Sequence, residues 1–181
     1  MALRKVKSLK ALIAKPYARF VQKNINKWSK NPLQTQEKVF QELIASATST
    51  AFGEDHDFVS INSHNDFVKR VPIRDYEAIK DYVVRVVNGE ENILWKGKPI
   101  YFAKTSGTTS GAKYIPITKE SMPYHIEAAR NAILMYVAEK GKTDFIDGKM
   151  IFLQGSPILE EKNGIKLGRL SGIVAHYVPK Y

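Results

Sequence analysis

The chain has 181 residues, of which 44% are hydrophobic and 10% aromatic, a composition typical of a folded globular protein. It contains no cysteine, which excludes disulfide bonds, thiolate zinc sites and a cysteine nucleophile. The net charge is +10, the longest apolar run is Ala132–Ala138, and the lysine-rich start lacks the apolar centre of a secretory signal. A membrane span needs roughly 20 apolar residues, so we expect a cytoplasmic protein.

The positive charge is concentrated at the N-terminal end. Residues 1–30 hold nine lysines and arginines and no acidic residue, whereas residues 31–181 are almost neutral. Such a segment can meet nucleic acid, an anionic membrane or an acidic surface. The favoured interpretation is a basic amphipathic helical segment over residues 1–30 that packs its apolar side on the rest of the protein.

Helices are predicted where apolar residues recur every three or four positions. The segments with this pattern are residues 8–28, 32–53, 64–69, 75–89 and 118–140. Pro16 is expected to kink or divide the first helix, and Pro32 fits the first position of the second. Asp75 can cap the fourth, and Thr118 or Ser121 can cap the last.

Strands are predicted between these helices. The candidate segments are residues 93–95, 100–104, 114–117 and 149–153. Residues 55–63 are expected to form a loop, and residues 155–181 are rich in glycine with weak periodicity. The mixture of helices and strands predicts an α/β or α+β fold.

A loop rich in hydroxyl groups joins the strands predicted at 100–104 and 114–117. Its sequence is Thr105-Ser-Gly-Thr-Thr-Ser-Gly-Ala-Lys113. Glycines let the backbone approach a phosphate closely, backbone N–H groups form an anion-binding concavity, and hydroxyls add donors. With Lys113 as a compact positive charge, the composition predicts a phosphate cradle.

Two other phosphate-binding loops are excluded by spacing. A Walker A loop has four residues between its glycines and a lysine directly after the second, but here three residues separate Gly107 from Gly111 and Ala112 precedes Lys113. The dinucleotide fingerprint Gly-x-Gly-x-x-Gly is also absent. A hairpin loop with ordinary turn chemistry is the remaining alternative, and the full pattern from Phe102 disfavours it.

The pattern from Phe102 to Lys113 matches the phosphate-loop signature of the adenylate-forming superfamily. Together with Val71–Lys80 and Leu94–Pro99, it resembles the auxin-responsive (Gretchen Hagen) acyl-acid amido synthetase family over most of residues 35–181. The resemblance implies an α/β fold, the N-terminal part of the large domain of an adenylate-forming enzyme, with helices packed on a partial mixed sheet. It further implies that residues 31–181 are an incomplete N-terminal portion of an adenylation domain.

The resemblance also implies a two-step ligase reaction. ATP and a carboxylic acid give an acyl-adenylate and pyrophosphate, and an amine or amino acid then attacks to give an amide, with ATP and Mg²⁺ as cofactors. Lys113 would be catalytic, neutralising charge as pyrophosphate leaves. The implied phosphate-binding residues are Thr105, Ser106, Gly107, Thr108, Thr109, Ser110 and Gly111.

Two features set this chain apart from the family pattern. Plant members place two residues between the second glycine and the lysine, whereas this chain has only Ala112, as acyl-CoA synthetase loops do, so coenzyme A stays open as the acceptor. The acidic nucleotide motif, the ribose-binding aspartate and the mobile C-terminal domain do not appear before Tyr181. We therefore expect a fragment that does not adenylate a substrate by itself.

Other residue types add little chemistry. His125, on the helix after the loop, and Ser171 are candidates for the acyl pocket. The four histidines lack paired metal spacing, so no metal site is predicted, and Ser171 lacks a Gly-x-Ser-x-Gly elbow, so hydrolase chemistry has no support.

Two classes of function are left open. In the enzyme interpretation, the full-length protein loses adenylation when Lys113 or Ser106 becomes alanine, and its partners are a carboxylic acid and an amine. In the binding interpretation, the basic helix docks on nucleic acid or an anionic membrane, and deleting residues 1–30 abolishes a salt-dependent association. Nucleic acid is not expected as a partner, and a membrane surface is less favoured than the enzyme interpretation.

Overall fold

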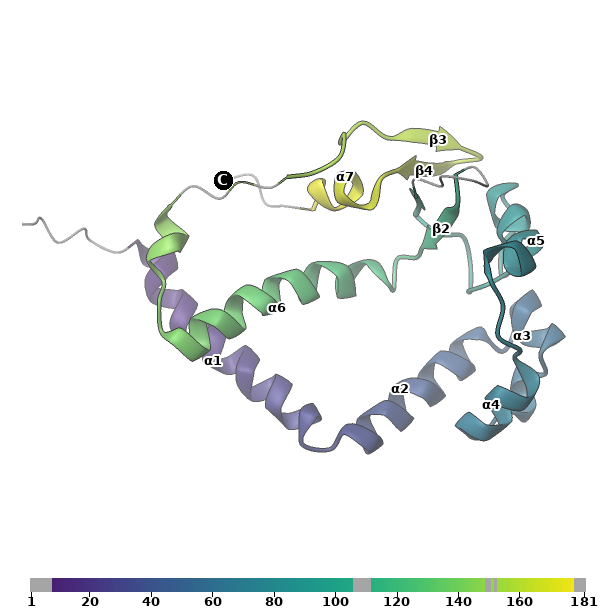
Figure 1. Ribbon diagram of the computed structural model, residues 1–181, viewed down its shortest axis with the longest axis horizontal. Helices are drawn as coiled ribbons and strands as arrows, with labels where there is room; N and C mark the ends of the chain where they lie inside the picture. The colour runs from purple at the N-terminus through teal and green to yellow at the C-terminus, as the bar shows by residue number, and fades with distance from the viewer. Residues whose placement is uncertain (1–7, 106–111, 149–150, 152, 178–181) are drawn as a thin grey trace, which may run out of the picture. The chain divides into compact units, whose positions relative to one another are not determined.

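The computed structural model describes residues 8–105, 112–148, 151 and 153–177 (Figure 1). Two compact units divide the chain, one of residues 1–35 with 124–153 and the other of residues 36–123 with 154–181. The helices are α1 (Leu9–Ser29), α2 (Pro32–Ala47), α3 (Ala51–Asp55), α4 (His64–Arg70), α5 (Tyr76–Val87), α6 (Met122–Lys140) and α7 (Leu170–Ala175), with 3-10 turns η1 (Phe58–Ser60) and η2 (Asp144–Asp147). The strands are β1 (Tyr101–Lys104), β2 (Tyr114–Ile117), β3 (Glu160–Lys162) and β4 (Ile165–Gly168).

Helix α1 packs on α6 in the first unit. Ser8 caps α1 by accepting a hydrogen bond from the Ala11 N–H at 3.3 Å, and Pro16 lies inside the helix without dividing it. The contact is a small cluster of buried side chains: Ala18, Val21, Leu134 and Val137. The large apolar side chains of α1 point elsewhere and are exposed: Leu9, Leu12, Ile13, Phe20 and Trp28. The helix therefore buries small residues and leaves an apolar and basic outer face.

The predicted helix over 32–53 is wrong in its end point, because α2 stops at Ala47 and α3 begins at Ala51. The break comes from Thr50, which donates its hydroxyl to the Ala47 carbonyl at 2.7 Å and accepts the Gly53 N–H at 3.0 Å. Gly53 lies inside α3, where a Cβ would come 2.1 Å from the Ala47 carbonyl oxygen. Glycine is needed here for close backbone approach rather than for ending the helix.

The predicted short helix at 64–69 is confirmed as α4, which begins with reciprocal bonds between Ser63 and Asp66. Ser63 caps the helix by accepting the Asp66 N–H at 3.2 Å, and it donates its hydroxyl to the Asp66 carboxylate at 2.7 Å. The Ser63 bond lowers the pKa of Asp66. Upstream, residues expected to be loop include η1, and its Phe58 joins Ile44, Ala47 and Ile61 in a buried cluster.

The sheet is mixed, with strand order β2-β1-β4-β3. Strand β1 pairs antiparallel with β2 and parallel with β4, and β3 pairs antiparallel with β4. The predictions at 100–104 and 114–117 are confirmed as β1 and β2, whereas β3, β4 and α7 arise in the segment expected to be irregular. The α/β class with helices packed on a mixed sheet is confirmed.

Two other strand predictions differ from the structure. Residues 93–95 are not a strand, because the N–H groups of Ala51 and Phe52, at the start of α3, take the carbonyls of Asn92 and Ile93 at 2.8 and 3.0 Å. The strand predicted at 149–153 falls partly outside the described residues, since 149, 150 and 152 are not described. Residues 151 and 153 lie outside any strand.

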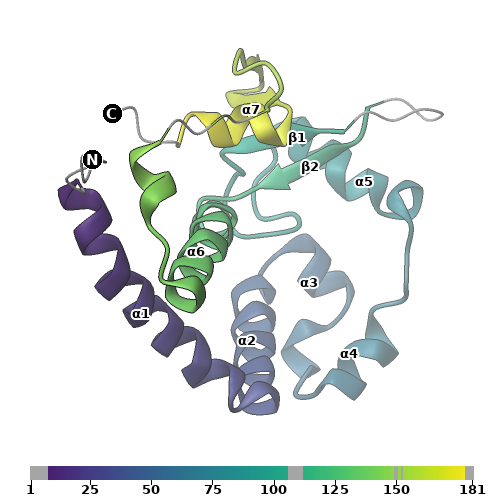
Figure 2. The same ribbon diagram turned by 60° about the vertical axis from the view of Figure 1, so that its left-hand side comes forward.

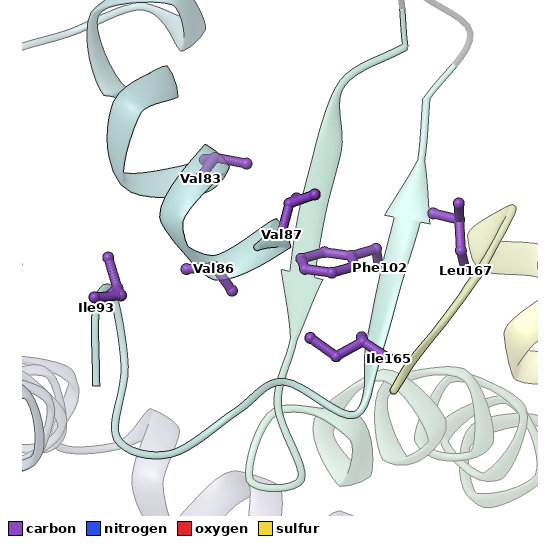
Figure 3. Packing of buried hydrophobic residues seen from close by; sticks show 7 residues of the cluster. All are labelled: Val83, Val86, Val87, Ile93, Phe102, Ile165 and Leu167. Atoms are coloured by element: carbon purple, nitrogen blue, oxygen red, sulfur yellow. The ribbon is translucent and has the colours of Figure 1, made fainter. Parts of the chain in front are cut away.

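Helix α5 covers one face of the sheet. Asp75 caps it as predicted, accepting the Ala78 N–H at 2.9 Å. Three of its valines belong to a single buried cluster that Figure 3 shows from close by: Val83, Val86, Val87, Ile93, Phe102, Ile165 and Leu167. Helix α7 lies beside β1 (Figure 2), with Ile173 fully buried. Strand β1, which leads into the hydroxyl-rich loop, is thus fixed by packing.

Candidate phosphate-binding site

The hairpin of β1 and β2 holds the two ends of the loop together. Lys104 is in register with Tyr114, and one step further the Thr105 N–H donates to the Lys113 carbonyl at 3.1 Å. The predicted phosphate-binding residues 106–111 lie outside the described residues, so the structure places the base of the loop, Thr105 and Ala112–Lys113.

The Lys113 side chain lies against an aromatic ring from α5. Its ammonium Nζ is 5.2 Å from the centroid of the Tyr76 ring, within the range of a cation–π contact. The Tyr76 hydroxyl accepts the Tyr114 N–H at 3.0 Å. In the part of the chain that the structure describes, no carboxylate forms an ion pair with Lys113.

A cavity of about 520 Å³ opens beside the base of the loop. It lies at the carboxyl ends of the parallel strands β1 and β4, where open α/β sheets bind ligands. Its charged lining residues are Lys104, Glu160 and Arg169, and a Lys104–Glu160 ion pair of 3.8 Å crosses from β1 to β3. Thr105 and Ser156 add hydroxyls, while Ile158 and Leu167 are apolar. Volume and lining suit an anionic small molecule.

Four polar or charged lining residues were not predicted from the sequence: Lys104, Ser156, Glu160 and Arg169. Lys104 directly precedes the loop motif, so its position in the sequence could have indicated that it lies at the site. Ser156, Glu160 and Arg169 come from the segment without periodicity, and nothing in their local sequence marks them.

Of the two predicted acyl-pocket residues, Ser171 belongs to the same unit as this cavity and is not among its lining residues. His125 is exposed on α6. Ser171 accepts the Gly155 N–H at 2.9 Å and so ties the segment before β3 to α7. A second tie is the 2.7 Å contact between His176 Nε2 and the Pro157 carbonyl. The acyl-pocket role of His125 and Ser171 stays a prediction.

Tyr177, at the C-terminal end of the described chain, contacts Tyr101 on β1. The Tyr177 hydroxyl donates to the Tyr101 hydroxyl at 3.3 Å, and the two rings meet edge to face. Burial, helped by this bond, raises the pKa of Tyr177 to about 12. Tyr177 is thus a neutral donor at physiological pH.

The described residues contain no group of three His, Asp or Glu side chains that could hold a metal ion by itself. Among the described helices, none combines the length and the hydrophobicity that a membrane-spanning segment requires.

Comparison with known proteins identifies the family. A family model described as the GH3 family N-terminal domain matches residues 21–179. The chain belongs to the GH3 family. Indole-3-acetic acid-amido synthetase GH3.2 of Arabidopsis thaliana is 29% identical over 55% of this chain and 19% of its own length. Jasmonoyl–L-amino acid synthetase JAR4 of Nicotiana attenuata is 23% identical over 77% of this chain and 24% of its own length.

Solved structures of the GH3 family share the fold. The structure described as AtGH3.15 acyl acid amido synthetase in complex with 2,4-DB superposes with a TM-score of 0.72 at 22% identity, covering 84% of this chain and 27% of that one. At this identity the likeness establishes the fold alone. The chain spans about a fifth of the length of the curated relatives it matches.

Proposed function

We propose that this GH3 chain forms the ATP-phosphate-binding part of an acyl-acid amido synthetase. The observation that carries the proposal is the loop of five hydroxyl residues and two glycines, which ends in Ala112 and Lys113 and is closed by the hydrogen bond between Thr105 and Lys113. The cavity beside it supports the same conclusion, because its two cations, Lys104 and Arg169, exceed its one carboxylate, Glu160, and leave a net positive charge that would attract an anionic substrate.

The proposed reaction has two balanced steps. A carboxylate oxygen attacks the α-phosphorus of ATP, the bond to the β-phosphate breaks, and pyrophosphate leaves with the electron pair. An amine nitrogen then attacks the acyl carbon, AMP leaves with the electron pair of the broken acyl–oxygen bond, and the nitrogen loses a proton. Charge accumulates on the departing phosphates in the first step, so a fixed cation lowers its barrier.

The residues of the loop have separate roles in the proposal. Thr105, Ser106, Thr108 and Thr109 hold the phosphates, with the backbone of Gly107, Ser110 and Gly111 forming the cradle, and Lys113 offsets the charge of the leaving pyrophosphate. Mg²⁺ bound together with the nucleotide at this loop would supply further neutralisation of the phosphate charge. The loop residues are compatible with Mg²⁺, because this ion commonly takes its ligands from substrate phosphates and water rather than from several protein side chains.

The acceptor in the proposal is an amine or an amino acid. The names of relatives favour it: one is 4-substituted benzoates-glutamate ligase GH3.12 of Arabidopsis thaliana, and others join indole-3-acetic acid or jasmonate in amide bonds. Three different acids occur in these names, so the acid is not set by membership of the family. Coenzyme A stays the alternative acceptor because the loop has the shorter spacing before Lys113.

Replacing Lys113 by alanine tests the proposal directly. We expect the 181-residue chain to bind ATP, and Lys113→Ala to weaken binding by about tenfold or more, the size of a charge-assisted hydrogen bond. Isothermal titration measures the affinity. Lys119→Ala, an exposed lysine just after β2, removes the same charge away from the loop base and is the control. Equal losses in both variants, or no ATP binding by the wild-type chain, would contradict the proposal.

A second candidate function concerns the outer face of α1. This face combines exposed Phe20 with Lys23 and Lys27, in a segment with no acidic residue, which is the chemistry that an anionic membrane surface attracts. Nucleic acid fits less well, because the protruding side chains Leu9, Leu12 and Ile13 are aliphatic.

Vesicle co-sedimentation separates the two partners. The chain should bind vesicles of phosphatidylglycerol and phosphatidylcholine but not phosphatidylcholine alone, and binding should fall as salt rises. Lys23→Glu with Lys27→Glu should abolish it, because each basic residue near an anionic surface contributes about 1 kcal/mol. The control is the same charge change at Lys96 and Lys119. Retention of oligonucleotides but not vesicles would rule out the membrane.

A further inference from the structure

Tyr76 connects the first turn of α5 to the base of the phosphate-binding loop. Its ring lies 5.2 Å from the Lys113 ammonium, and its hydroxyl accepts the backbone N–H of Tyr114 at 3.0 Å. One side chain thus contacts both the cation and the backbone immediately after it. We propose that Tyr76 is the positioning residue of Lys113, its ring setting where the ammonium stands and its hydroxyl fixing the adjoining backbone.

Tyr76 is itself held firmly. It is the first residue of α5, directly after the cap that Asp75 makes, and it packs against the main buried cluster together with Tyr114. The far end of the same helix is anchored in that cluster by Val86 and Val87. The ring is therefore held by packing on one side and by its hydroxyl hydrogen bond at the tip, which gives a lysine resting on it a defined place.

An aromatic partner suits a lysine that must meet phosphate. A carboxylate would hold the ammonium but cancel its charge, as Glu160 does for the neighbouring Lys104 at 3.8 Å. A ring attracts the ammonium through its quadrupole and leaves the full positive charge for an anion. The side chain of lysine also has large rotamer freedom, and holding it in advance reduces the entropy lost when the anion binds.

The inference rests on the proposed function, since it assumes that Lys113 meets phosphate. Two other roles for Tyr76 predict different results. If the ring only fills space at the start of α5, its loss lowers stability without a specific effect through Lys113. If the ring keeps the ammonium away from the loop, its loss strengthens anion binding.

The test uses the full 181-residue chain, with ATP and inorganic tripolyphosphate as probes. Tyr76→Leu removes the ring and the hydroxyl, whereas Tyr76→Phe keeps the ring. The matched control is Tyr82→Leu, because Tyr82 also lies on α5 and packs against the same cluster but donates its hydroxyl to Asp55, at 2.6 Å. Each substitution is combined with Lys113→Ala to give a double-mutant cycle.

We expect two results: an NMR shift of Lys113 that is seen without any ligand, and a change in the affinity for tripolyphosphate. In NMR spectra the methylene protons next to the Lys113 ammonium should be shifted upfield by the ring, and the shift should vanish in Tyr76→Leu and persist in Tyr76→Phe. Tyr76→Leu should weaken tripolyphosphate binding by about five- to tenfold, the size of the rotamer entropy that a lysine no longer held in place loses when the anion binds. In the Lys113→Ala background the same substitution should change affinity by less than about twofold.

The outcomes are distinguishable. Equal losses from Tyr76→Leu with and without Lys113, stronger binding in Tyr76→Leu, or absence of the upfield shift would overturn the positioning role while leaving the proposed function intact. A wild-type chain that bound neither ATP nor tripolyphosphate would overturn the proposed function and this role together.

Discussion

Phe102→Ala is expected to lower the free energy of unfolding by about 3–5 kcal/mol, the usual cost of removing a fully buried phenylalanine. The Phe102 side chain is 0% exposed and lies among the valines of α5 and the β4 residues Ile165 and Leu167 (Figure 3). Alanine would leave a cavity whose walls belong to a helix and two strands, so collapse around it is limited. Urea unfolding followed by circular dichroism measures the loss.

The control for this substitution is Phe20→Ala, which removes the same atoms from the exposed face of α1, where a change within about 0.5 kcal/mol is expected. Domains of this size are stable by about 5–15 kcal/mol, so the Phe102 loss is a large fraction of the total. A cost below about 1 kcal/mol would mean that the α5–sheet contact is not the main core. Because Phe102 lies three residues before Thr105, ATP binding should weaken as the base of the loop loosens.

The parts of the fold that sequence predicts are those with a local signal. Asp75 before an apolar helical stripe predicted both the cap and the helix, and the strands on either side of the loop were placed within one residue. Strand β3 has no such signal, because Glu160–Lys162 are all exposed and charged and pair with β4 at the edge of the sheet. Ile93 gave a strand signal because it is apolar, but its carbonyl pairs with the start of α3.

The residues of the candidate site also differ in whether a local sequence signal marks them. The loop motif and Lys113 are contiguous in sequence, so their chemistry could be predicted. Tyr76 is 38 positions from its hydrogen-bond partner Tyr114, so no local pattern connects the two residues. Arg169 reaches the cavity only because β4 pairs in parallel with β1. Contacts made through sheet pairing carry no pattern in a single sequence, so these two residues became visible in the structure alone.

Gly172→Ala is expected to deform the wall of the cavity. A Cβ at this position would lie 2.1 Å from the Ser156 carbonyl oxygen, far closer than real Cβ contacts, and the obstructing atom is backbone rather than the end of a flexible side chain. Alanine has a better helix propensity than glycine by about 1 kcal/mol, but overpacking of this kind costs about 1–3 kcal/mol and the backbone must move as well. The clash therefore outweighs the propensity gain.

The displacement caused by Gly172→Ala falls on the segment that carries Ser156 and Ile158, two lining residues of the cavity. At a temperature where both proteins are folded, we expect Gly172→Ala to bind ATP more weakly than the wild-type chain. The weaker affinity would then come from the displaced cavity wall and not from unfolding. Gly97→Ala is the control: no atom lies within 4 Å of its added Cβ, so it bears the strain of its positive φ of 70° and leaves the cavity untouched. Unchanged ATP affinity in Gly172→Ala, with the expected drop in stability, would mean that ATP does not reach the Ser156 wall. The bound phosphates would then lie on the loop itself, toward Lys113 and Tyr76.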